Sequence, residues 1–179
     1  MRRSAELNAP SLAGIRVGVV VERRKAKGPW AEFLYRPISV LEGVPAAPPW
    51  TPISVEKNLT TFYAGDAVIE LHRTETANYR DNLASGAPLL WVVLRSGSGA
   101  VGFDLLSVTA DPAEGEALTG AGNDLVESVP MPDAIQEIVR NFVAEHHVEH
   151  SFFKRERDRS ASPSPATGPE ARRLKHERP

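Results

Sequence analysis

An uninterrupted apolar run, Leu89–Leu94, constrains the fold of this chain more than any other feature of its sequence. The run contains no polar residue and has the length of one strand, so it predicts a β-strand that is buried on both faces. A stretch rich in ionisable side chains, residues 70–83, comes shortly before it. That stretch has the pattern of a strand that leaves the core and continues into a short charged helix.

The composition limits the kind of protein. With 179 residues, 41% hydrophobic and 25% charged, the chain has the profile of one globular domain with tails. It contains no cysteine, which excludes disulfides, thiolate metal sites and a cysteine nucleophile. The N-terminus has arginines at positions 2 and 3 but no apolar segment behind them, so we predict a cytoplasmic protein without a secretory signal. No run approaches the roughly 18 apolar residues of a membrane span.

The net charge of −2 is unevenly distributed. Residues 154–179 hold eight Lys/Arg and four Asp/Glu, a net charge of +4, which leaves 13 of 21 basic and 19 of 23 acidic residues, or −6, for the rest. An acidic body with a basic tail lacks the basic face that is typical of nucleic-acid-binding domains. We therefore expect no nucleic-acid partner.

Composition along the chain predicts three regions. Residues 1–14 are small and polar and form a predicted disordered N-terminal arm, and residues 156–179 form a predicted disordered Arg/Ser/Pro-rich tail. A single globular domain is expected between them, at residues 15–155. Its predicted strands cover residues 15–23, 30–35 with 37–41, 59–64, 67–72, 89–95, 101–109 and 125–129, and its predicted helices cover 74–85, 111–118 and the segment that begins at Pro132.

The order of these elements predicts an α+β fold. The strands come in hairpins, including one about Gly65-Asp66, so we expect a mainly antiparallel sheet of about six strands. A short helix follows the strand Glu70–His72, and an amphipathic helix ends the domain. A barrel-like closure of the sheet is the alternative. The break at Arg36-Pro37 should fall at a sheet edge or a bulge, because proline lacks the N–H of a ladder.

A proline-rich loop, residues 42–52, surrounds Trp50. Tryptophan is well buried on average, so one interpretation is a lid packed on the core. The other is that Trp50 is offered to a partner as part of a binding surface.

We define the charged corner as Glu70, His72, Arg73, Glu75 and Arg80. In a strand, Glu70 and His72 point to one face, and the other three residues follow at once. The corner could be a salt-bridged junction that serves only structure. It could instead be a recognition surface in which Arg73 and Arg80 meet a carboxylate or phosphate.

Residues 146–150 match the zinc pattern H-x-x-E-H. His146 and His150 are one helical turn apart and could share a metal, with Glu149 as a base. The pattern also needs a continuing helix and a third ligand, whereas the chain changes here to the composition of a tail. The pair is therefore only a weak metal candidate, and we expect no metal and no other cofactor. The sequence has no phosphate-binding loop and no nucleophile elbow, so no catalytic residue is assigned.

Several segments together carry a family resemblance: Val17–Arg24, Glu70–Thr76, Tyr79–Leu83, Pro130–Pro132 and Phe142–Glu149. Over about residues 15–155 they resemble an uncharacterised bacterial family with a domain-of-unknown-function label. Genes of that family typically lie beside molybdenum-dependent formate dehydrogenases and their maturation factors. The family's motifs are attached to no known chemistry, so the resemblance carries over no catalytic residue.

Some members of that family are labelled molybdopterin-guanine dinucleotide biosynthesis protein A. A nucleotidyltransferase of that kind has a glycine-rich loop after its first strand, where this chain has Glu22–Lys27. The resemblance therefore implies a non-catalytic accessory protein in assembly or maturation of a molybdenum-dependent formate dehydrogenase. Its expected partner is a formate dehydrogenase subunit or a maturation factor. The alternative is an enzyme or carrier that acts on the molybdopterin cofactor or a nucleotide.

Overall fold

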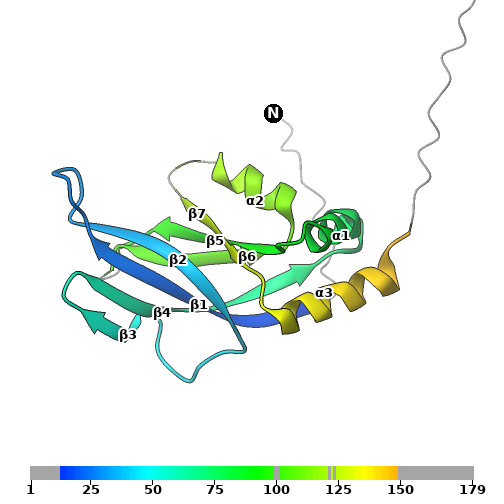
Figure 1. Ribbon diagram of the computed structural model, residues 1–179, viewed down its shortest axis with the longest axis horizontal. Coiled ribbons are helices and arrows are strands. Elements are labelled where there is room, and N and C mark those ends of the chain that lie inside the picture. Colours follow the sequence, from blue (N-terminus) through cyan, green and yellow to red (C-terminus); the bar gives the residue numbers. More distant parts are fainter. Residues whose placement is uncertain (1–12, 99–100, 121, 123, 149–179) are drawn as a thin grey trace, which may run out of the picture. The chain divides into compact units, whose positions relative to one another are not determined.

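Two antiparallel sheets face each other, with two helices at one end of them and a third on an outer face (Figure 1). This computed structural model describes residues 13–98, 101–120, 122 and 124–148, all within one compact unit. The strands are β1 (Ala13–Lys25), β2 (Phe33–Glu42), β3 (Thr51–Glu56), β4 (Leu59–Leu71), β5 (Leu89–Ser96), β6 (Phe103–Thr109) and β7 (Leu125–Pro130). The helices are the 3₁₀ turn η1 (Arg73–Glu75), α1 (Thr76–Ala84), α2 (Pro112–Thr119) and α3 (Asp133–His146).

The first sheet has the strand order β2-β1-β4-β3. Alternate residues of β1, namely Val17, Val19 and Val21, are fully buried and face the core. β1 begins at Ala13, which pairs with Leu71, so the first strand starts two residues before its predicted position. The rest of the predicted arm and the predicted tail, residues 156–179, lie outside the described residues.

The predicted hairpin at Gly65-Asp66 is wrong. β4 runs through both residues as one strand of 13 residues, and its two halves pair with the same strand, β1. The register shifts by one residue between Val19 and Val20, opposite Gly65, whose φ of +134° is a conformation that favours glycine. Gly65 therefore lies at a bulge, in which Ala64 is the extra residue, and not at a turn.

The prediction for Pro37 is confirmed. β2 is an edge strand of the first sheet, and Pro37 pairs with Val21 at the second register shift of β1. Pro37 is buried at this bulge, so the missing N–H interrupts the ladder where it is already irregular.

The second sheet has the order β6-β5-β7, which makes the apolar run its central strand. Leu90, Val92 and Leu94 are fully buried in the core between the sheets. Val93 is also fully buried, and Trp91 lies on the same outer face beneath α2, against Gly115. Both faces of β5 are therefore covered, as the run predicts.

The described strands number seven, not about six, and form two open sheets in place of a closed barrel. β4 lies against β6, and β2 lies against β7, but neither pair forms a ladder. A barrel requires such a ladder, and β4 already pairs with β3 through residues 59–63. The unpredicted strand β3 therefore occupies part of the edge that would have to meet β6.

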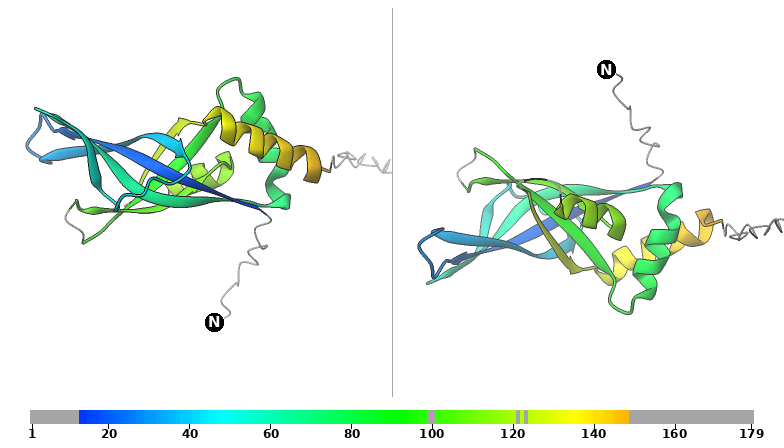
Figure 2. Two further views of the ribbon diagram at one scale, coloured as in Figure 1. Left: turned by 90° about the horizontal axis from the view of Figure 1, so that it is seen from below. Right: turned by 90° about the horizontal axis from the view of Figure 1, so that it is seen from above.

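α1 and α3 pack together at one end of the sheets, and α2 covers the outer face of the second sheet (Figure 2). The helix predicted at 74–85 begins instead as η1, and its N-cap Glu75 makes no side-chain capping bond. α3 is amphipathic as predicted, with Ile135, Val139 and Phe142 buried. No helix in the described part of the chain is long and apolar enough to span a membrane.

Candidate functional site

A polar pocket opens between β4 and β6, and we call it the seam pocket. Its volume is about 300 Å³. It is lined by Asp66, Ala67, Val68, Glu70, His72, Leu106, Ser107, Val108, Thr109 and Glu114. The alternate β4 positions 66, 68 and 70, with residue 72 after the strand, contribute to this wall, whereas Ile69 and Leu71 face the core. The strand period thus positions the polar side chains on the pocket side.

The structure brings together two members of the charged corner, Glu70 and His72, in this pocket. His72 Nε2 lies 3.8 Å from Glu70 Oε2. Across the pocket, the Thr109 hydroxyl donates to Glu114 Oε2 at 2.6 Å, and Asp66 forms an exposed ion pair with Arg16 at 3.1 Å. With three carboxylates in its lining, the pocket is suited to a cationic or hydrogen-bond-donating group and opposes a phosphate.

Within the described residues, Arg80 forms no hydrogen bond or ion pair with Glu70 or His72, and it contacts the end of α3 instead. Its Nη1 donates to His147 Nε2 at 3.0 Å. His147 Nδ1 lies 3.1 Å from the Thr76 hydroxyl, and that hydroxyl donates to the Arg73 carbonyl at 3.1 Å. Arginine is a donor only, so His147 Nε2 is the acceptor in this contact. The residues of the charged corner therefore do not form one ion-pair network, because Glu70 contacts His72 whereas Arg80 contacts His147.

The remaining corner residues lie on η1. The Arg73 side chain is exposed and, within the described residues, has no ion-pair partner. Glu75 accepts a hydrogen bond from the Asn78 amide at 3.1 Å. The guanidinium of Arg73 is thus available to an incoming anionic group.

Buried polar groups, which the sequence interpretation missed, hold the corner in place. Tyr79 is 2% exposed, and its hydroxyl accepts from the His72 N–H at 3.2 Å. Burial raises the pKa of Tyr79 to about 12. The Asn78 amide donates to Asp111 at 3.0 Å, and the buried Asn82 amide donates to the Leu89 and Ala110 carbonyls.

These contacts tie α1 to the start of β5 and the end of β6. The four-residue spacing of Asn78 and Asn82 on one helix face is the signal that could have indicated them.

Trp50 packs against the core rather than standing free. Its ring lies 6.5 Å from that of Tyr35 and 6.0 Å from that of Phe62, both in edge-on geometry. Its backbone has φ +64°, which is unusual for a bulky residue. The structure therefore places Trp50 as the lid interpretation expects. Trp50 is distant in the sequence from the charged corner, and its role in binding stays a prediction.

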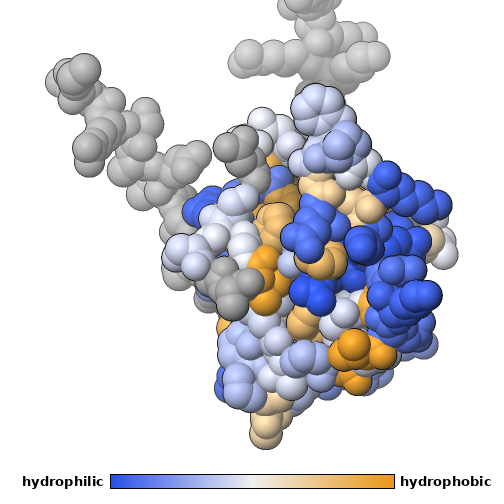
Figure 3. All heavy atoms as spheres, turned by 90° about the vertical axis from the view of Figure 1, so that its left-hand side faces the viewer, coloured by the Kyte–Doolittle hydropathy of each residue, from blue (hydrophilic) through white to orange (hydrophobic). Residues whose placement is uncertain are grey.

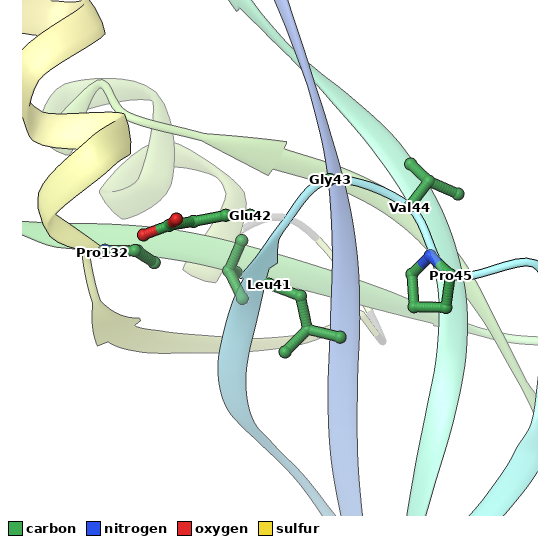
Figure 4. Close-up of a pocket in the computed structure, with 7 residues that line it drawn as sticks. Leu41, Glu42, Gly43, Val44, Pro45 and Pro132 are labelled. Atoms are coloured by element: carbon green, nitrogen blue, oxygen red, sulfur yellow. The ribbon is translucent and has the colours of Figure 1, made fainter.

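A second, more open pocket of about 580 Å³ lies where β2 ends near the start of α3 (Figure 4). Its lining is Val40, Leu41, Glu42, Gly43, Val44, Pro45 and Pro132. Figure 4 shows Glu42 directed toward Pro132, and in this view Val44 and Pro45 are on the other side of β1. One carboxylate among aliphatic side chains provides no acid–base pair, so this pocket suits an apolar contact.

The zinc pattern is only partly described by the structure. The His146 ring packs on Phe142 with a centroid distance of 4.6 Å, and its Nε2 lies 3.8 Å from Glu145. Glu149 and His150 lie outside the described residues. Among the residues that are described, no group of three His, Asp or Glu side chains is arranged to hold a metal ion.

The fold and the site define an α+β domain with a polar pocket at the seam between two open sheets. A family model described as "Protein of unknown function (DUF3305)" matches residues 16–157, and the chain belongs to that family. No curated protein and no solved structure matches the chain.

Proposed function

We propose that this protein is a non-catalytic accessory protein that binds a protein partner during assembly or maturation of a molybdenum-dependent formate dehydrogenase. The metabolic context rests on the family resemblance described above. The partner class is a formate dehydrogenase subunit or one of its maturation factors, and the proposed contact surface is the charged corner with the adjoining seam pocket.

The observation that carries the proposal is that three charged side chains of the corner, those of Glu70, Arg73 and Arg80, are exposed, whereas its buried contacts are made by other groups. The Glu70 side chain is 56% exposed, that of Arg80 is 47% exposed, and Arg73 is exposed on η1. The buried contacts are made instead by Tyr79 and by the two asparagines of α1. Exposed ion pairs contribute little to stability, so these charges are available for recognition.

The rival function is an enzyme or carrier for the molybdopterin cofactor or a nucleotide. Both ligands bear phosphate, and the seam pocket presents Asp66, Glu70 and Glu114. Like charges at close range oppose such a ligand. The acidic lining therefore favours a protein partner with donor groups over a phosphorylated ligand.

The test is complementation of a strain that lacks this gene, with formate dehydrogenase activity as the readout. We expect Arg73→Ala with Arg80→Ala to abolish complementation and to lower the free energy of unfolding by no more than about 1 kcal/mol, because both side chains are exposed. Arg140→Ala, an exposed arginine of α3, is the matched control and should complement fully.

Three outcomes would contradict the proposal. Normal formate dehydrogenase activity in the deletion strain would contradict a role in assembly or maturation of that enzyme. Full complementation by the double variant would show that Arg73 and Arg80 are not part of the contact surface. A decrease of about 3 kcal/mol or more in the free energy of unfolding of the purified double variant would show that the corner serves structure. A ligand-induced rise in Tm with a nucleotide or pterin would favour the rival function.

A further inference from the structure

The hairpin end of the molecule, opposite α1 and α3, carries a second candidate surface (Figure 1). We define it as residues 24–34 and 55–58, the tips of the β1–β2 and β3–β4 hairpins. Trp30 lies in the β1–β2 loop with 97% of its surface exposed. The loop is closed by the Ala26 N–H, which donates to the Glu32 carbonyl at 3.0 Å. Tryptophan is enriched at interfaces, where one part of the ring is in an apolar layer and the other is in water, so this exposed ring is a candidate binding group.

Basic side chains surround this tip. Lys25 is exposed at the end of β1, Lys27 is exposed in the loop that follows, and Lys57 is exposed in the turn between β3 and β4. The two tips are joined, because the Lys25 N–H donates to the Asn58 carbonyl at 3.0 Å. Over residues 24–34 and 55–58 four Lys/Arg stand against two Glu, a net charge of +2 on a chain whose total is −2.

The hairpin end also includes exposed aliphatic side chains. Leu34 is 58% exposed at the start of β2, and Val55 is 74% exposed near the end of β3. Figure 3 views the molecule from this end and shows strongly hydrophilic side chains gathered on one side of it, next to separate hydrophobic ones. The end thus combines an aromatic tip, apolar flanks and cations on one surface.

We propose that the hairpin end docks on an anionic lipid surface, with Trp30 in the interfacial layer and the lysines on lipid phosphates. Tryptophan favours the membrane–water interface, and lysine can keep its ammonium in the headgroup layer while its stem lies along apolar surface. Basic residues near an anionic leaflet each add to the attraction. A projecting tip fits a deformable layer better than a folded partner, which would need a pocket to receive the ring. This surface is separate from the charged corner and does not depend on the accessory function.

The experiment is flotation of the full-length protein with vesicles of phosphatidylcholine alone or mixed with phosphatidylglycerol. We expect binding to the mixed vesicles at least about tenfold tighter than to the neutral ones, and weaker at high salt. Lys25→Glu with Lys27→Glu should weaken binding to the mixed vesicles by at least about tenfold. Trp30→Ala should weaken it by about fivefold or more and should remove the blue shift of tryptophan fluorescence on binding.

The matched controls lie on α3, at the other end of the molecule. Arg140→Glu removes an exposed basic residue, and Ile138→Ala removes an exposed apolar one, so both should bind vesicles like the natural protein. Equal binding to neutral and anionic vesicles, no binding to either, or unchanged binding by the Trp30 variant would each overturn the proposal. Retention on immobilised polyglutamate or single-stranded DNA that depends on Trp30, without vesicle binding, would also overturn it and assign this end to a protein or nucleic-acid partner.

Discussion

Tyr79 connects the end of β4 to α1 and α3 through one side chain. Its hydroxyl accepts from the backbone of His72, and its ring lies edge-on to Phe142 at a centroid distance of 6.3 Å. Burial raises its pKa to about 12, with a smaller opposing effect from the His72 hydrogen bond. The phenol therefore stays neutral over the physiological range and fixes the direction in which the chain leaves the first sheet.

Tyr79→Phe should give a stability difference that depends on pH. At pH 8 the variant should be less stable by about 1–2 kcal/mol, because the His72 N–H loses its acceptor. Above pH 10 the unfolded natural chain releases the phenolic proton while the folded chain keeps it until about pH 12, so unfolding becomes easier as pH rises. This penalty, up to about 3 kcal/mol, is absent from the variant.

Urea denaturation of both proteins between pH 8 and pH 11.5 measures this difference. The free-energy gap between natural protein and variant should shrink above pH 10. Other tyrosines and lysines titrate in both proteins and cancel in the comparison. A gap that stays constant with pH would show that Tyr79 is not buried in the folded state as described.

Contacts of the site could be predicted from the sequence where the residues are close together in the chain, and could not where they are far apart. Glu70 and His72 share a side because a strand alternates, which the sequence alone predicts. Asn82 donates to Ala110, 28 residues away, and Asn78 to Asp111, 33 residues away. A polar residue on a short helix ordinarily faces water, so only the packing of α1 on the end of β6 makes these asparagines structural.

Among the elements, α2 depends on one close approach. Gly115 lies against the indole of Trp91, and a Cβ at this position would overlap the ring. This contact seats α2 on the outer face of β5 and covers the side of the apolar run that the first sheet does not. Glycine is unfavourable inside a helix, so its presence here reflects packing rather than helix propensity.

Gly115→Ala should destabilise the protein by about 1–3 kcal/mol, although alanine is the better helix former. The overlap with Trp91 must displace either α2 or the indole. Gly120→Ala is the control: this glycine ends α2 with φ −85° and only an ordinary contact near its Cβ position, so the change should cost under about 0.5 kcal/mol. Equal or greater stability of Gly115→Ala in urea denaturation would mean that α2 is not seated on Trp91.

The bounds of helices and strands could be predicted where they depend on local sequence. The predictions were wrong where strand pairing determines the structure. Gly65-Asp66 has the composition of a hairpin turn, but a glycine with positive φ also suits a bulge. Pairing of both halves of β4 with β1 selects the bulge, and that pairing is non-local. β3 was missed because Pro52 and a short, mostly exposed segment give a weak strand pattern.

At the scale of the whole molecule, the part of the chain that the structure describes is organised around one hydrophobic core between two open sheets. Val19 of β1, Ile69 of β4 and Val92 of β5 belong to the same buried cluster. Val139 of α3 is part of that cluster too, so sheets and helices share one interior. The seven-strand arrangement is antiparallel, as the hairpin pattern predicts, but the choice between open sheets and a barrel is not local. It depends on β3 pairing with β4 and on the polar lining of the seam pocket.

A shared core predicts that the two sheets unfold together, even though no ladder joins them. Urea unfolding followed by far-UV circular dichroism and by tryptophan fluorescence should give one midpoint, with a slope of about 1–3 kcal/mol per molar urea. In a Trp30→Phe background, Trp50→Phe leaves Trp91 as the reporter of the second sheet, and Trp91→Phe leaves Trp50 as the reporter of the first. Each variant should show coincident fluorescence and dichroism transitions. Residues in a common core cannot lose their packing independently. Separate fluorescence and dichroism midpoints within one variant would therefore mean that the two sheets unfold as two independent units.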